Sequence, residues 1–286
     1  MLGDVVNGIA FGAILFVLAS DFSLALGVIR IINIAHGAFY MLAVYIALSF
    51  QESTGNFLLA AAASSLATLV LAVLVQRLVL SRFALEPLPQ VLSTYGIMLI
   101  IAEATRLIWG GYPQVLDTPE MLGGAFFFGS VILPKYRLFL IVVAVVLAVV
   151  MGLILQRTRI GAFVRAAVDD EEMAQSIGIN INWLYAGLFG AAGFLAGLAG
   201  ALGGPVLGAF QGVEFEVLTL TLVVVVLGGM GSVLGAFLGA MLVGILDAVG
   251  RASVPELAQF VLFVPMIIFL ALRPQGLLGK RVAQDA

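Results

Sequence analysis

The sequence predicts an all-α integral membrane protein, and three observations support this fold class. Of the 286 residues, 63% are hydrophobic and only 10% are charged, whereas about 25% of the residues of a typical soluble domain are charged. The mean hydropathy is +1.19. The apolar residues gather in runs of about 20, which is the length that a helix needs to cross a bilayer.

The apolar runs predict seven single spans and one longer tract. Tract 215–250 is too long for one straight span, and Gly228-Gly-Met-Gly-Ser232 interrupts it near its middle. Two short helices or a re-entrant pair are therefore favoured over one rod. We expect eight or nine hydrophobic elements in a single transmembrane domain over residues 1–286. The single spans are predicted at 5–29, 33–50, 57–76, 90–110, 136–156, 183–204 and 257–272.

The basic residues predict the orientation of these spans, because cytoplasmic loops retain positive charge. Loops 77–89 and 157–182 and the C-terminus are predicted to be cytoplasmic, and 111–135 is predicted to be the main outer loop. The first apolar run has no basic segment before it, so we expect it to remain as a span. If the spans alternate, nine of the 13 basic residues fall on one side, namely Arg30, Arg77, Arg82, Arg157, Arg159, Arg165, Arg273, Lys280 and Arg281.

The composition also excludes several kinds of site. The chain has no cysteine, which excludes disulfides, thiolate metal sites and cysteine nucleophiles. Its 13 basic and 16 acidic residues give no basic footprint for nucleic acid. One histidine leaves little from which to build a membrane-embedded enzyme, which needs a nucleophile with a base or several metal ligands.

A polar segment interrupts the apolar pattern after Arg30. Polar groups in hydrocarbon are costly unless they are paired or line a wet cavity, so this segment indicates a break in a membrane helix or part of a solute path. An interfacial turn is the alternative. His36 is either a proton relay or a hydrogen-bonding group that orients the helix. The predicted substrate pathway comprises Asn33, His36, Gly37, Tyr40, Ser93, Thr94 and Tyr95.

Acidic residues in the spans raise the alternative of a proton-coupled carrier, which needs titratable carboxylates deep in its path. The candidates Asp21 and Glu103 fall well inside spans. The spacing of Glu103 and Arg106, and that of Asp247 and Arg251, instead predicts ion pairs along one helix face. Glu214 and Glu216 are further candidates.

The loop after residue 157 predicts an amphipathic helix of about 161–176 that Gly178 ends. Apolar side chains alternate in it with the acidic run Asp169 to Glu172. Such a helix at the end of a bundle suits a groove on a partner protein. Packing against the protein's own membrane helices is the alternative.

Several motifs in combination resemble the LivH-type permeases of bacterial ABC importers for branched-chain amino acids. The likeness runs from about residue 5 to residue 280. The motifs are Ile31-Ile-Asn-Ile-Ala-His-Gly-Ala-Phe-Tyr-Met-Leu42, Pro89-Gln-Val-Leu92 with Tyr95-Gly96, Arg157-Thr-Arg-Ile-Gly161 to Gly178-Ile-Asn180, Val226-Leu-Gly-Gly-Met-Gly-Ser232 and Arg273-Pro-Gln-Gly-Leu-Leu-Gly279.

This resemblance implies a multi-pass subunit of the bacterial inner membrane, with no catalysis of its own. Its implied partners are two ATP-binding cassette subunits, a second permease of the LivM type and an extracytoplasmic substrate-binding protein. The sequence has no Gly-x-x-x-x-Gly-Lys-Ser/Thr stretch, so we expect no cofactor in this chain and ATP only on the partners. The resemblance also implies an ATPase-coupling loop, with Gly161, Arg165, Ala166, Ala174, Gly178 and Asn180 at matching positions. The charges themselves predict that Arg165 and the acidic run that begins at Asp169 set the orientation at the rim of this contact.

The family resemblance leaves the solute open. Ala38 stands where the family often has Glu, Ala43 where it usually has Gly, and Asp21 where small residues are common. These positions flank the polar segment. Related permeases carry urea, short amides or aromatic acids, and an ion-coupled secondary transporter is the remaining alternative.

Overall fold

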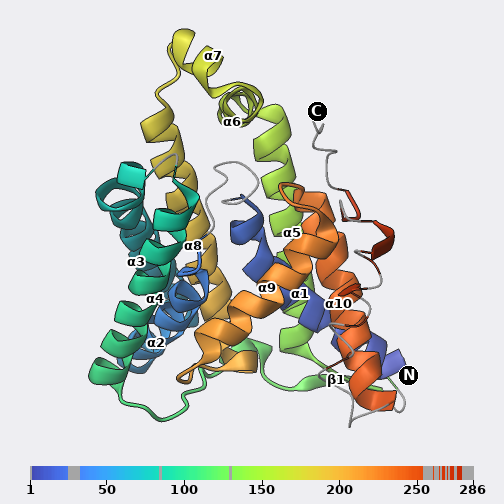
Figure 1. Ribbon diagram of the computed structural model, residues 1–286. Helices are drawn as coiled ribbons and strands as arrows, with labels where there is room; N and C mark the ends of the chain where they lie inside the picture. Colours follow the sequence, from blue (N-terminus) through green and yellow to red (C-terminus); the bar gives the residue numbers. More distant parts are fainter. Residues whose placement is uncertain are drawn as a thin grey trace.

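The computed structural model describes residues 2–24, 33–83, 86–128 and 131–253, and from the remaining C-terminal part 260, 264, 266, 267, 269, 271–273 and 276–278. The described residues form a helical bundle with a short β-hairpin (Figure 1). Its elements are α1 (Leu2–Leu24), α2 (His36–Thr54), α3 (Phe57–Leu78), η2 (Leu80–Phe83), α4 (Pro87–Trp109), η3 (Glu120–Leu122), β1 (Ala125–Phe128), β2 (Val131–Pro134), α5 (Lys135–Arg157), α6 (Arg159–Asp169), α7 (Glu171–Ser176), α8 (Ile181–Leu207), α9 (Val213–Gly228) and α10 (Val233–Ser253).

The predicted spans agree with the observed helices. Among the described residues, α1, α3, α4, α5, α8 and α10 are long and apolar enough to cross a membrane. The predicted spans 33–50 and 215–250 correspond to α2, with 19 residues, and to α9 followed by α10. Most of the predicted span 257–272, and residues 25–29 of the first, lie outside the described residues.

The long apolar tract is a pair of helices, as predicted. α9 ends at Gly228 and α10 begins at Val233, so the break falls on the glycine-rich motif. Gly229 and Gly231 have φ of 95° and 78°, a region that side chains with a Cβ rarely adopt. A Cβ on Gly235 would overlap the carbonyl oxygen of Gly228, so glycine at this position lets the two helices pack closely.

Small residues also bring the other helices together. α1 packs mainly on α10, and α3 on α8. A Cβ on Gly193 or Gly197 of α8 would overlap atoms of Thr68 in α3. Close approach of this kind stabilises helix pairs in lipid, where burial of apolar surface gives little drive for association.

The loops gather at two opposite ends of the bundle (Figure 1). η2, α6 and α7 lie at one end, and the β1–β2 hairpin lies at the other. Segment 111–135 also carries a bridge in which the backbones of Gln114 and Ala209 exchange hydrogen bonds of 2.8 Å. This bridge ties the segment to the end of α8.

Candidate functional site

The polar segment after residue 32 lies inside the bundle, where α2 begins. Asn33 and His36 are both buried. The side-chain oxygen of Asn33 accepts a hydrogen bond of 3.1 Å from the backbone nitrogen of Ala35, and Thr94 Oγ1 of α4 accepts one of 3.2 Å from the nitrogen of Ile34. These side chains bond backbone N–H groups that have no partner within the helix. The burial favours an interior helix break over an exposed interfacial turn.

His36 joins three helices. Its Nδ1 lies 2.6 Å from Asp21 Oδ2 of α1, and its Nε2 lies 3.4 Å from Thr221 Oγ1 of α9. Phe22 packs edge-on against the imidazole, with 5.4 Å between ring centroids. A buried carboxylate needs such a partner, because an isolated charge in an apolar interior is very costly. Contacts on both nitrogens fix the ring, which favours the orienting role of His36.

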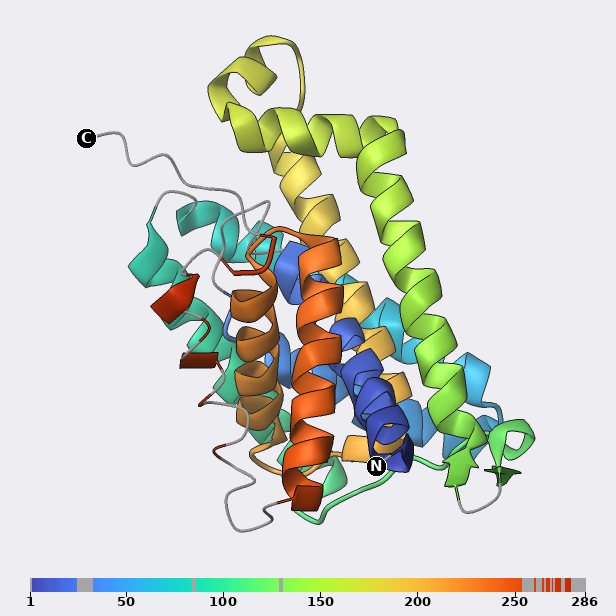
Figure 2. The ribbon, with the colours of Figure 1, turned by 90° about the vertical axis from the view of Figure 1, so that its right-hand side faces the viewer.

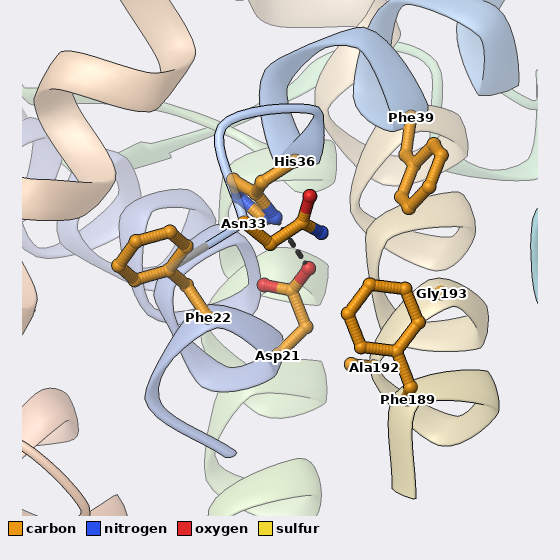
Figure 3. Close-up of a pocket in the computed structure, with 8 residues that line it drawn as sticks. All are labelled: Asp21, Phe22, Asn33, His36, Phe39, Phe189, Ala192 and Gly193. Carbon is orange, nitrogen blue, oxygen red and sulfur yellow. Dashed lines mark ion pairs between the residues drawn. The ribbon is translucent and has the colours of Figure 1, made fainter. Parts of the chain in front are cut away.

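A small cavity lies beside this pair (Figure 3). Its volume is about 10 Å³, which is about the room that one water molecule needs. Polar and aromatic side chains from α1, α2 and α8 meet there. The lining residues are Asp21, Phe22, Asn33, His36, Phe39, Phe189, Ala192 and Gly193.

The contacts from Asp21 through His36 to Thr221 resemble the hydrogen-bonded series of a carboxylate, a base and a hydroxyl nucleophile in hydrolases. Nucleophilic chemistry at the hydroxyl needs room beside it for a reacting group. Thr221 is fully buried and does not line the cavity, which lies beside Asp21. The arrangement therefore favours a fixed imidazole over a nucleophilic site.

The predicted pathway residues of α4 differ in their burial. Thr94 is fully buried and contacts the helix break, whereas Tyr95 is 41% exposed on the outer face. Ser93 is half-buried. Successive residues of a helix point about 100° apart, which explains why Thr94 and Tyr95 lie on different faces of α4. Tyr95 is therefore not part of this buried site, and its place in the pathway stays a prediction.

Two other predicted pathway residues have packing roles. The hydroxyl of Tyr40 donates a hydrogen bond of 3.3 Å to the carbonyl oxygen of Gly208, outside the cavity lining. A Cβ on Gly37 would overlap the carbonyl oxygen of Glu214, because the first turns of α2 and α9 cross there in contact. The prediction that Gly37 lines the pathway is corrected to a helix-crossing role.

The sequence pattern did not predict that Thr221, Phe39 and Phe189 lie next to the polar segment. Thr221 is a hydroxyl within the apolar run of α9, and this contrast was the available signal. The two phenylalanines carry no such signal, since aromatic residues are common throughout the spans.

Three of the other candidate carboxylates, Glu103, Asp247 and Glu214, have local partners, whereas Glu216 is exposed. Arg106 Nε donates to Glu103 Oε2 at 2.9 Å, and Arg251 Nε donates to Asp247 Oδ2 at 2.8 Å. The predicted pairing along each helix is thus confirmed. Glu214 Oε2 accepts a hydrogen bond of 3.0 Å from the backbone nitrogen of Gly212.

The loop after α5 contains two helices, which corrects the predicted single helix of 161–176. α6 ends at Asp169, and Asp170 Oδ1 accepts a hydrogen bond of 2.9 Å from the backbone nitrogen of Met173. Asp170 is therefore the N-cap of a new helix, and Glu171 and Glu172 follow in its favourable first turn. Figure 2 shows α6 lying across the end of the bundle between α5 and α8.

Several predicted coupling residues hold the shape of this loop. A Cβ on Gly161 would overlap the carbonyl oxygen of Leu155, so only glycine fits the corner between α5 and α6. The guanidinium of Arg165 donates to that same oxygen, and its side chain is exposed. Gly178 has a φ of 92°, and Asn180 Oδ1 caps α8 by accepting from the nitrogen of Trp183 at 3.2 Å.

The exposed and buried faces of the loop are clearly divided. Ala174 is 1% exposed and packs with Ala167 and Ile181 of this chain, while Ala166 lies at the edge of that cluster. This burial corrects the predicted position of Ala174 in a contact with a partner. Asp169 is exposed. Four apolar side chains stand out from the loop, and we call them the exposed loop face: Ile160, Phe163, Met173 and Ile177.

Comparisons with known proteins agree on one family. A family model described as "Branched-chain amino acid transport system / permease component" matches residues 5–270. The high-affinity branched-chain amino acid transport system permease protein BraD of Pseudomonas aeruginosa is 30% identical over 301 residues, which cover 98% of this chain and 96% of that protein. The corresponding protein LivH of Salmonella typhimurium is 26% identical over 302 residues, with the same two coverages.

A solved structure is also similar in fold. PsaBC from Streptococcus pneumoniae in complex with Fab superposes with a TM-score of 0.51 at 10% identity, covering 95% of this chain and 89% of that one. At this identity the likeness concerns the fold alone.

Proposed function

This chain belongs to the family of branched-chain amino acid transport system permease components, and from this premise we propose that it is the membrane-spanning permease subunit of an ABC importer. Its solute is a branched-chain amino acid or a related small polar compound. The observation that carries the proposal is the family match over residues 5–270. The nearly full coverage of two relatives named as permease proteins supports it.

The polar cavity supports a role in moving a solute. It joins a buried carboxylate, an imidazole and an amide within a bundle of apolar helices. Polar groups inside a membrane span are costly and mark solute or ion paths. Transport needs contacts that are favourable enough for entry and weak enough for release.

Partner subunits supply the energy in this proposal. Two ATP-binding cassette subunits hydrolyse ATP on the cytoplasmic side of the membrane. A second permease of the LivM type completes the path, and an extracytoplasmic binding protein delivers the solute. The exposed loop face supports a contact with an ATPase subunit, because apolar side chains at the end of a bundle suit a groove on a partner. The complex resides in the bacterial inner membrane.

The test is reconstitution of the complex in vesicles. Leucine uptake should require ATP inside the vesicles together with the binding protein on the opposite side. Urea, a short amide and an aromatic acid, offered with the same complex, test the alternative cargoes. Uptake by the isolated chain that follows an imposed ion gradient and ignores ATP would instead establish a secondary transporter.

A further inference from the structure

One oxygen of the buried Asp21 carboxylate has no partner in the described part of the chain. Oδ2 contacts His36, but Oδ1 has no hydrogen-bond donor among the described residues and is shielded from solvent. The residue is only 2% exposed. Leaving a buried acceptor of this kind unsatisfied is costly, so this atom calls for a ligand.

The surroundings of Asp21 define the chemistry of that ligand. Figure 3 shows the carboxylate among three phenylalanines, with the Asn33 amide beside His36. A carboxylate repels anions and attracts cations, and the faces of aromatic rings also attract cations. On the α8 side the cavity is bordered by the small side chain of Ala192 and by Gly193.

We propose that Asp21 is the acceptor for the ammonium group of the transported solute, and that His36 is the positioning residue which holds the carboxylate toward it. This inference rests on the proposed function and narrows its solute to an amine-bearing compound such as a zwitterionic amino acid. The cavity has room for about one water molecule, and an ammonium group is of similar size. The rest of the solute requires the surrounding helices to separate during transport.

Asp21 discriminates between the candidate cargoes by charge. An ammonium group forms a hydrogen bond with charge on both partners, about twice as strong as a neutral one. Urea and short amides offer only neutral N–H donors, and aromatic acids without an amine carry the same sign as the carboxylate. The contact with His36 already occupies one oxygen of the carboxylate and moderates the attraction, which favours release after passage.

The absence of cysteine from the chain allows a direct test. Ala192→Cys introduces one thiol in the cavity wall. The assembled complex in vesicles, turning over ATP, is treated with a cationic methanethiosulfonate and with a neutral one of equal size. We expect the cationic reagent to react about tenfold faster, as for one charge-assisted hydrogen bond. Equal rates, or no reaction during turnover, would overturn the inference.

Three variants of the Ala192→Cys protein distinguish an effect of the Asp21 charge from an effect of altered structure around the cavity. Asp21→Asn removes the charge at constant size and should bring the two rates together. Asp21→Glu keeps the charge and should keep the cationic reagent faster. Asp247→Asn changes another buried carboxylate, one already paired with Arg251, and should leave the wild-type ratio unchanged. An undiminished ratio in Asp21→Asn would show that another group attracts the cation.

Failure of this inference is distinguishable from failure of the proposed function. Leucine uptake driven by ATP and the binding protein, measured on the unmodified complex, tests the importer alone. Normal ATP-driven uptake together with equal reagent rates would reject Asp21 as the ammonium acceptor and retain the importer. ATP-independent uptake would reject the importer, whatever the reagent rates.

Discussion

The carboxylate of Asp21 and the imidazole of His36 form a buried pair that joins α1 to the first turn of α2, with 2.6 Å between Oδ2 and Nδ1. His36→Leu leaves the carboxylate without this partner. Breaking a buried pair in this way costs about 3–5 kcal/mol, so the variant should unfold at a much lower temperature in detergent. Adding Asp21→Ala removes the stranded charge and should restore part of the loss. A double variant no more stable than His36→Leu alone would argue against the pairing.

Gly37 should tolerate no side chain. A Cβ at this position would overlap the carbonyl oxygen of Glu214, so Gly37→Ala should destabilise the protein by about 1–3 kcal/mol or more. Gly96→Ala is the matched control, because a Cβ on Gly96 in the middle of α4 meets nothing within 4 Å. The control should gain about 0.5–1 kcal/mol from helix propensity. Thermal unfolding of the two variants in detergent measures the contrast, and equal unfolding temperatures would contradict the crossing.

Replacement of Thr94 should slow solute uptake, whereas replacement of its neighbour Tyr95 should not. Thr94→Val keeps the shape but removes the acceptor for the backbone nitrogen of Ile34, and an unsatisfied buried donor costs about 1–3 kcal/mol. We expect slower leucine uptake at equal membrane expression. Tyr95→Phe alters only an exposed side chain and should leave uptake unchanged. The reverse pattern would place Tyr95 in the pathway.

The sequence predicted most of the membrane helices and much less of the site. Long apolar runs determine helices whatever their neighbours, so the long helices were predicted from the lengths of these runs, and the break between α9 and α10 from the glycine motif. Which face of α4 turns inward depends on packing between helices, and a mean hydropathy carries no such information. The separation of Thr94 from Tyr95 was therefore not predicted, and neither was the contact between His36 and Thr221, 185 residues apart.

The loop after α5 shows a second limit of prediction from sequence, the position of a break between two helices. Its apolar and acidic pattern continues across Asp170, so periodicity predicted one helix where there are two. Aspartate before two glutamates is a helix-start signal, and it would have located the break. Burial of Ala174 depends on α8 folding back beside α7, which local pattern cannot predict.

Cysteines at the two ends of the bundle test the predicted orientation. Thr118→Cys lies in segment 111–135, and Asp169→Cys lies at the end of α6; both side chains are exposed. An impermeant maleimide added to intact cells should label the Thr118→Cys protein and not the Asp169→Cys protein. After cell lysis both should react. Labelling of Asp169→Cys alone in intact cells would invert the predicted topology.

The exposed loop face should transmit ATP hydrolysis to the membrane helices. Met173 is 61% exposed, so Met173→Asp should change the stability of the chain by no more than about 0.5 kcal/mol. If Met173 contacts an ATPase subunit as proposed, the aspartate would be buried in that contact without a partner of opposite charge. Loss of a central interface contact costs about 2 kcal/mol, so ATP hydrolysis stimulated by the loaded binding protein should fall at least tenfold.

Two further variants separate coupling from folding. Met121→Asp makes the same change at a side chain that is 92% exposed at the opposite end of the bundle, and it should leave stimulated hydrolysis and uptake intact. Ala174→Arg should act differently from Met173→Asp, because Ala174 is buried within its own loop and the arginine would disrupt α7 before any partner binds. Proteolysis should then cut the loop of the isolated Ala174→Arg chain and spare that of Met173→Asp. Full stimulation and full uptake by Met173→Asp would exclude Met173 from the contact with the ATPase, and the proposed transmission through α6 and α7 would lose its structural support.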